Sequence, residues 1–223
     1  MTAALDVIYE DEVLLVVDKP TGILVHGDGT GTQTLTDLVA DHLAATGRPD
    51  ARPQAVQRLD VGTSGLVLFS LDKATQPALD AQVAGHAMAK RYLAVVQGRF
   101  PSGEKVIEQP LGRDRHDARR MRVCAPGRGK PALTRVRCLA YAGGRSLLAV
   151  ELGSGRKHQI RVHLAHLGFP IVGDTLYNGA RSASGLLLHA FEEELEHPLT
   201  HERLCLRTAW PARLGAWDPA LWG

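Results

Sequence analysis

Asp60 is the only carboxylate in the stretch QRLDVGTSGL, residues 57–66, and small residues follow it. An aspartate in such a turn usually accepts hydrogen bonds from its own backbone. A carboxylate can also act as a nucleophile or stabilise a developing positive charge. The residue type alone favours the first role, and the second requires partner side chains.

Two other side chains that could take part in chemistry lie further along the chain. Tyr92, in KRYLAVVQG, offers a flat ring and a hydroxyl group. Arg161, in GRKHQIRVHLAHLG, falls in the N-terminal half of a predicted helix over residues 156–167, with Ser154 as its cap. Amide donors and the positive end of the helix dipole collect there, so an anion could lie beside Arg161.

Other chemistries are poorly supported. Of the three nearby histidines, only His163 and His166 have helical i, i+3 spacing, and His158 completes no ligand set, so we expect no metal. Ser64 is not in a G-x-S-x-G elbow. The glycines of residues 27–31 lack a phosphate-loop pattern and favour a flexible loop over a phosphate-ligand site, and we expect no nucleotide cofactor.

Positive charge is concentrated in one segment. The whole chain carries a formal charge of only +2, yet residues 113–137 hold two aspartates and nine basic side chains: Arg113, Arg115, Arg119, Arg120, Arg122, Arg128, Lys130, Arg135 and Arg137. Guanidinium groups suit bidentate phosphate contacts and stacking on bases, so the segment is a candidate nucleic-acid contact, with a solvated loop as the alternative. Pro126 and two glycines favour a hairpin or loop.

The apolar pattern predicts an α+β protein with a largely antiparallel sheet. Strands are expected at 13–18 and 22–26 as a hairpin, at 66–71 and at 91–98, with more strands after residue 131. A helix should follow the Thr34–Asp37 capping box and end at Gly47, and another should cover 73–88, opened late or kinked by Pro77.

Composition is that of a globular, cytoplasmic protein. Apolar residues make up 44% of the 223-residue chain and charged residues 22%. There is no apolar run long enough for a membrane helix, and the N-terminus is acidic where a signal peptide would be basic. At 223 residues, we expect one large domain.

Five motifs in order resemble the RluA-type family of RNA pseudouridine synthases, over roughly residues 12–202. RLDVGTSGLVLFS is similar to the family signature H-R-L-D-x-x-T-S-G-L. The other four are LLVVDKPTGILVH, KRYLAVVQG, GRKHQIRVHLAHLGFPIVGDTLYNG and LLLHAFEEELEHPLTHE. The resemblance implies a mixed, mainly antiparallel central sheet with flanking helices and a catalytic cleft. It also implies a single catalytic domain over residues 1–223, with no S4-like RNA-binding module ahead of it, and we expect a monomer.

The resemblance also implies a function. Uridines in ribosomal RNA and/or tRNA would be isomerised to pseudouridine without cofactor or metal, after the base is flipped out of the RNA. Asp60 would be the catalytic aspartate, Tyr92 the active-site tyrosine and Arg161 the basic partner of the aspartate. The residues expected to bind RNA are Arg58, which would enter the base stack, and Arg156, Lys157, His158, Arg119, Arg120 and Arg122. Attack at C6, attack at C1′ and a glycal route stay open.

The chain departs from the family pattern at three positions. Gln57 replaces a histidine, Lys157 replaces a threonine, and His201 stands where glycine is common, which should affect only a turn. Gln57 cannot titrate near neutral pH. It therefore motivates an alternative, a catalytically impaired RNA-binding protein that retains the fold.

Overall fold

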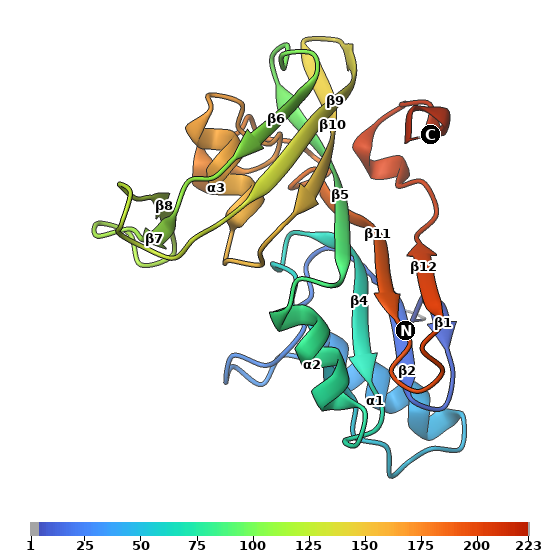
Figure 1. Cartoon of the computed structure of the whole chain (residues 1–223). Coiled ribbons are helices and arrows are strands. Elements are labelled where there is room, and N and C mark those ends of the chain that lie inside the picture. The colour runs from blue at the N-terminus through green and yellow to red at the C-terminus, as the bar shows by residue number, and fades with distance from the viewer. Residues whose placement is uncertain (1–4, 223) are drawn as a thin grey trace. The chain divides into compact units, whose positions relative to one another are not determined.

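The computed structural model describes residues 5–222, which divide into two compact units. Unit 1 comprises the chain up to Met88 together with Ala190–Ala209. Unit 2 comprises Ala89–His189 together with the chain from Trp210 onward. Both units combine strands with helices (Figure 1), and the predicted α+β class is confirmed.

Unit 1 is built on a sheet with the strand order β1-β2-β4-β11, in which β12 pairs with β11 and β3 with β4. Four of these pairs are antiparallel, whereas β4 and β11 point the same way in Figure 1, which makes the sheet mixed. The strands are β1 (Val7–Glu10), β2 (Leu14–Lys19), β3 (Gln54–Ala55), β4 (Ser64–Ser70), β11 (Leu188–Glu196) and β12 (Arg203–Arg207).

Two helices cover opposite faces of this sheet. Alternate residues of β2 and β4 point to opposite sides, so each strand contributes to two apolar layers. Helix α1 (Leu35–Ala45) packs Leu35, Val39 and Leu43 on the layer that contains Phe69. Helix α2 (Gln76–Ala84) packs Leu79 on the other layer. Each fully buried leucine contributes about 1.5–3 kcal/mol through apolar area removed from water.

The start of α1 explains why one predicted strand is absent. The Thr34–Asp37 capping box forms as expected, and the helix ends just before Gly47. Residues 22–26 do not form a strand, so the predicted hairpin is wrong. The carbonyl groups of this segment accept hydrogen bonds from the first turn of α1, at Leu35 and Thr36, and β2 pairs with β1 instead.

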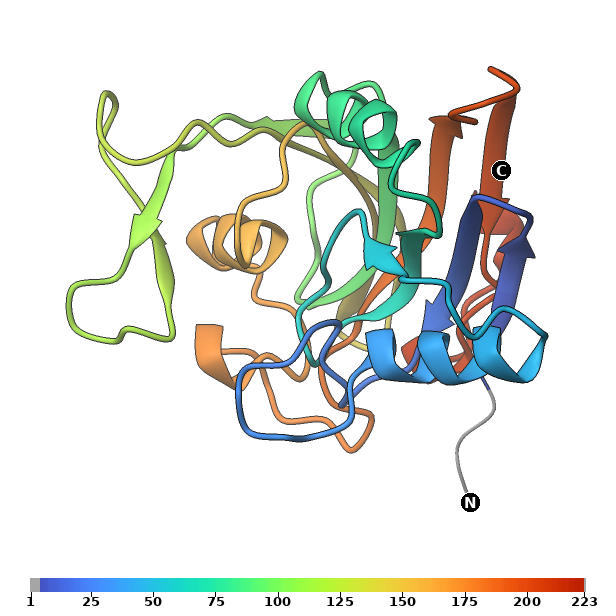
Figure 2. The ribbon, with the colours of Figure 1, turned by 90° about the horizontal axis from the view of Figure 1, so that it is seen from below.

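Unit 2 contains an antiparallel sheet in the order β5-β10-β9-β6 and a separate two-stranded hairpin, β7–β8. Figure 2 shows this hairpin standing apart from the sheet. The elements are β5 (Ala89–Gln97), β6 (Glu104–Ile107), β7 (Leu111–Arg113), β8 (Met121–Val123), β9 (Thr134–Ala142), β10 (Arg145–Leu152), α3 (Gln159–His166) and the short helices η1 (Thr175–Tyr177), η2 (Ala212–Leu214) and η3 (Pro219–Trp222). No helix among residues 5–222 has the length and apolar character needed to cross a lipid bilayer.

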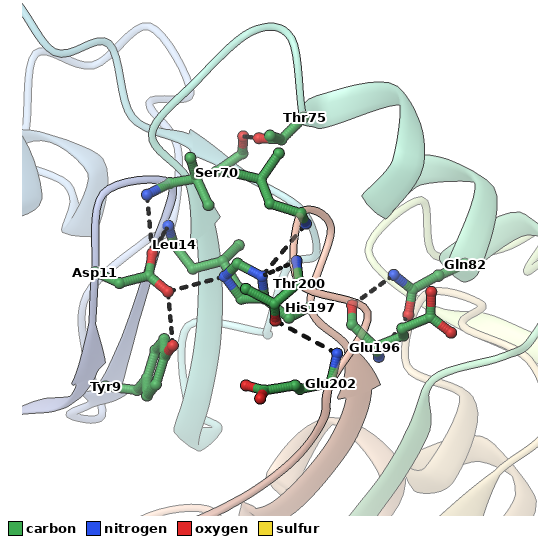
Figure 3. A network of polar contacts seen from close by, with 12 residues as sticks. Tyr9, Asp11, Leu14, Ser70, Thr75, Gln82, Glu196, His197, Thr200 and Glu202 are labelled. Atoms are coloured by element: carbon green, nitrogen blue, oxygen red, sulfur yellow. Dashed lines mark hydrogen bonds and ion pairs between the residues drawn. The ribbon is translucent and has the colours of Figure 1, made fainter.

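A polar network ties two turns of unit 1 together (Figure 3). His197, at the end of the β11 region, accepts the backbone N–H of Thr200 at Nδ1 (3.0 Å). Its proton must therefore lie on Nε2, which donates to Asp11 Oδ2 (2.9 Å). Tyr9 donates its hydroxyl proton to the same oxygen (2.6 Å). The network joins the β1–β2 turn to the β11–β12 turn, where His201 adopts a positive φ of 60° and so occupies a conformation that favours glycine.

Candidate active site

Asp60 lies half-buried in the turn that leads into β4. Its carbonyl oxygen accepts the backbone N–H of Thr63 (3.0 Å), which closes the turn. The carbonyl of the next residue, Val61, accepts two donors: the backbone N–H of Gly22 (2.8 Å) and Nζ of Lys19 (3.4 Å). The K-P-T-G loop and the Asp60 turn therefore fix each other.

Lys19 is fully buried, which is rare for a lysine. Its ammonium group donates to the carbonyl oxygens of Pro20 (2.9 Å) and Ile23 (3.0 Å) as well as that of Val61. These oxygens offset the cost of removing the charge from water. Lys19 thus links, through its hydrogen bonds, two segments that are 42 residues apart in the chain.

A close approach of two strands explains why the T-S-G sequence has a glycine at position 65. Its φ is +113°, and a Cβ at this position would lie 2.2 Å from the carbonyl oxygen of Ala190 in β11. Only a residue without a side chain allows β4 to approach β11 so closely. The register of β4, and with it the placement of the preceding Asp60 turn, depends on this contact.

The two residues before Leu59 are held differently. Gln57 donates from Nε2 to Oε2 of Glu193, a buried carboxylate of β11, so the residue that replaces the family histidine has a structural partner. Arg58 is exposed. Its charge lowers the pKa of His26, after the larger effect of burial, which places the guanidinium near that imidazole.

Tyr92 lies near the start of β5, as predicted, and is buried. It pairs with Val150 of β10, which in turn pairs with Val136 of β9. Thr134 shares a face with Val136, and its hydroxyl contacts Nδ1 of His163 in α3 (2.8 Å). Because directly paired residues of antiparallel strands point to the same side, Tyr92 lies on the face of the unit 2 sheet that α3 covers.

Helix α3 begins later than the sequence predicts. Its first residue is Gln159, and Ser154 does not cap it but donates to Oε1 of Gln159 (2.8 Å). His158 precedes the helix with a positive φ of 58°. His163 uses both ring nitrogens, one with Thr134 and the other with the carbonyl of Gln109 (2.9 Å), which gives this buried histidine a structural role.

Arg161 projects from α3 into a bidentate ion pair with Asp174. Nε donates to Oδ2 (2.7 Å) and Nη2 to Oδ1 (2.9 Å). The side chains are only 11% and 1% exposed, so the pair is shielded from water. Two parallel hydrogen bonds fix the plane of the guanidinium as well as its position.

Tyr177 of η1 lies at the centre of the surrounding cluster. Its ring centroid is 5.1 Å from Cζ of Arg161 and 5.3 Å from Cζ of Arg120. Its hydroxyl oxygen accepts the backbone N–H of Met121 (2.8 Å) and forms a second hydrogen bond with Nδ1 of His158 (2.8 Å). Burial raises the pKa of this phenol, which keeps it protonated.

The remaining residues predicted to bind RNA lie in the β7–β8 loop and before α3. Arg119 is exposed and forms a bidentate pair with Asp117. The hydrogen bonds from Arg119 lower the pKa of the Asp117 carboxyl group to about 2. Arg122 and Lys157 are exposed. Arg156 is half-buried and donates from Nε to the carbonyl of Pro131 (3.0 Å).

A cluster with metal-ligand atoms occurs away from these residues. Within residues 5–222, the candidate ligand atoms of Glu192, Glu194 and Cys205 lie within 4.8 Å of one another. Arg207 forms an ion pair with the first carboxylate and Arg203 with the second. Both carboxylates are therefore already balanced by cations.

Comparison with known proteins identifies the family. The sequence profile described as RNA pseudouridylate synthase matches residues 13–166, which contain Asp60, Tyr92 and Arg161. The chain belongs to the RNA pseudouridylate synthase family. The family membership predicted from the five motifs is thus confirmed.

Several curated members of the family are similar to this chain. An uncharacterized RNA pseudouridine synthase of Bacillus subtilis is 37% identical over 212 residues, which cover 93% of this chain and 69% of that protein. Ribosomal large subunit pseudouridine synthase D of Zymomonas mobilis is 36% identical over 200 residues, covering 86% and 62%. A further synthase, of Chloroflexus aurantiacus, is 44% identical over 188 residues, covering 81% and 58%. The chain spans between 58% and 69% of the length of these relatives.

Solved structures of the pseudouridylate synthase family share the fold. Human RNA pseudouridylate synthase domain containing 1 matches with a TM-score of 0.79 at 26% identity, covering 95% of this chain and 86% of that one. Human RNA pseudouridylate synthase domain containing 4 matches with a TM-score of 0.77 at 23% identity, covering 94% and 90%. The predicted pseudouridine synthase fold is confirmed.

The residues of the predicted pseudouridine synthase site do not all belong to one unit. Asp60 and Arg58 belong to unit 1, whereas Tyr92 and Arg161 belong to unit 2. The convergence of the three catalytic candidates on one cleft stays a prediction. Sequence reasoning assigned no role to Asp174, Tyr177 or Lys19, although all three fall in motifs that carry the family resemblance.

Proposed function

We propose that this protein converts uridine to pseudouridine in RNA. The observation that carries the proposal is the family match over residues 13–166, which includes Asp60, Tyr92 and Arg161. The reaction breaks the bond between C1′ and N1 and forms one between C1′ and C5. The proton lost from C5 is balanced by the proton gained at N1, so no co-reactant is needed.

In this proposal, Asp60 acts at the sugar or the base of a flipped nucleotide. A carboxylate must be ionised to attack or to stabilise positive charge, and we assign to Arg161 the role of basic partner that favours this ionised form. The bidentate bond to Asp174 supports this role, because it holds Arg161 in one orientation. Attack at C6, attack at C1′ and a glycal route all fit these side chains.

Tyr92 and Arg58 serve the base in the proposal. The ring of Tyr92 holds the detached uracil, and its hydroxyl takes part in proton removal. Extruding a base from stacked RNA costs a few kcal/mol, which Arg58 partly offsets when it fills the gap. The exposure of Arg58 supports this assignment.

The proposed substrate is ribosomal RNA and/or tRNA. One of the relatives named above is a ribosomal large subunit pseudouridine synthase, so large-subunit ribosomal RNA is the first substrate to test. A cytoplasmic location and a monomeric state, both expected from the sequence, belong to the same proposal. The alternative of an impaired RNA-binding protein gains no support, because Gln57 has a structural partner in Glu193.

The test is to incubate the protein with unmodified ribosomal RNA and tRNA and to map pseudouridine by its carbodiimide adducts. New adducts are expected with the wild type and none with Asp60→Asn, which keeps the shape of the side chain but cannot ionise. Asp50→Asn, a change at an exposed aspartate of unit 1, is the matched control and should leave the adducts in place. If the wild type binds these RNAs but forms no pseudouridine in either, the proposal is wrong.

A further inference from the structure

The arginines of the β7–β8 loop do not have equivalent surroundings. Arg119 faces solvent and pairs with Asp117, and Arg122 is exposed. Arg120 instead turns inward, where its Nε atom is buried and has no hydrogen-bond partner among residues 5–222. A buried donor without a hydrogen-bond partner is unfavourable, so another contact must hold Arg120 in place.

That contact is the ring of Tyr177. Cζ of Arg120 lies 5.3 Å from the ring centroid, within the range of a cation–π interaction. The residue after Arg120 adds a second attachment, because the backbone N–H of Met121 donates to the Tyr177 hydroxyl (2.8 Å). The loop is thus fixed to η1 through both a side chain and the backbone.

Arg161 also lies over the ring of Tyr177. Its Cζ lies 5.1 Å from the centroid, so the two guanidinium carbons are within about 10 Å of each other, and Asp174 is the carboxylate that pairs with Arg161. The phenol responds to both cations, which lower its pKa against the larger effect of burial. A displacement of Arg120 therefore acts on the support of Arg161 as well as on the loop.

We propose that Arg120 is a positioning residue, which docks the arginine-rich loop on Tyr177 and thereby fixes Arg161 for the reaction. This inference rests on the proposed function. It separates two roles within one cluster of cations: Arg122 contacts RNA phosphate, whereas Arg120 acts through Tyr177. RNA bound by the loop is then held at a set position relative to α3.

The two roles predict different kinetic signatures. Arg120→Met keeps the aliphatic stem but removes the charge over the ring, and we expect a fall in single-turnover rate of about 10-fold or more with little change in RNA affinity. Arg122→Met should weaken RNA affinity and reduce its salt dependence, because a phosphate contact is lost. Arg120→Lys keeps a cation and should recover part of the rate.

The experiment measures single-turnover rate, RNA affinity and thermal unfolding for each variant. Arg145→Met, at an exposed arginine of unit 2 outside the cluster, is the charge-matched control. If Arg120→Met loses affinity but not rate, or if Arg120→Lys is no better than Arg120→Met while both remain folded, the positioning role is wrong. A wild type without activity on RNA instead contradicts the proposed function, so the two failures are distinguishable.

Discussion

Arg161 and Asp174 form two parallel hydrogen bonds, at 2.7 and 2.9 Å, in a setting almost closed to solvent. Removing one partner of such a pair leaves a buried charge, which costs about 3–5 kcal/mol. Asp174→Asn keeps the shape but loses the charge and one acceptor, so we expect a large loss in the free energy of unfolding, measured by urea denaturation. The control is Glu151→Gln, which weakens the more exposed pair with Arg91 and should cost less than about 1 kcal/mol. Equal losses in the free energy of unfolding for the two variants would contradict the conclusion that the Arg161–Asp174 pair is shielded from water.

Gly65 should tolerate no side chain. Gly65→Ala combines an unfavourable positive φ with a Cβ 2.2 Å from the Ala190 carbonyl oxygen, so we expect a loss of more than about 2 kcal/mol in the free energy of unfolding. At Gly22, φ is +89° and no atom lies within 4 Å, so Gly22→Ala has only the backbone strain of about 1–2 kcal/mol. A Gly65→Ala protein as stable as the Gly22→Ala protein would show that β4 and β11 can separate freely.

His189 makes stability depend on pH. Burial, and then the charge of Arg213, lower its pKa from 6.5 to about 3. Below pH 6.5 the unfolded chain binds a proton that the folded protein excludes, so the free energy of unfolding falls as the pH drops from 6.5 towards 3. The slope from this group approaches about 1.4 kcal/mol per pH unit.

The measurement is urea denaturation between pH 7 and 4. His189→Gln removes the titrating group and should flatten the profile, whereas His116→Gln, in the exposed loop between β7 and β8, should not. An unchanged profile in the His189→Gln protein would assign the acid sensitivity to other groups.

Tyr92 is predicted to contribute its hydroxyl to turnover. Tyr92→Phe retains the ring, so RNA affinity should persist while the rate falls by about 100-fold or more, the usual contribution of a positioned proton donor or acceptor. Tyr141→Phe, at an exposed tyrosine of β9, is the matched control. Full activity in the Tyr92→Phe protein would remove the hydroxyl from the mechanism.

Arg119 and Arg122 should differ in their contribution to RNA binding. Arg119 is already paired with Asp117, whereas Arg122 has no ion-pair partner among residues 5–222. Arg122→Met should therefore lower the slope of log affinity against log salt by about 0.7–0.9, and Arg119→Met by less. Equal slopes for the two variants would show that Asp117 releases Arg119 when RNA binds.

Local patterns predicted the elements whose determinants are close in sequence. The Thr34–Asp37 capping box, the helix opened late by Pro77 and the strand around Tyr92 all appear in the structure. Each depends on hydrogen bonds or packing within a few residues, which a sequence displays directly.

Long-range partners could not be predicted in the same way. Residues 22–26 are apolar enough for a strand, but their carbonyls are taken by α1. No spacing rule in the sequence pairs Asp174 with Arg161, because one residue lies in a helix and the other in the loop that follows it. The likeness to a family supplied roles for Asp60, Tyr92 and Arg161, and side-chain contacts were needed to bring Tyr177 and Arg120 into the same cluster.

The burial of the Lys19 amine makes its chemical labelling a measure of local opening. Acylating reagents modify lysines that solvent can reach, and Nζ of Lys19 is covered and surrounded by carbonyl oxygens. Its labelling rate, followed by mass spectrometry, would therefore report how often the loop beside Asp60 comes open. The other five lysines of the chain would serve as internal standards for reagent strength.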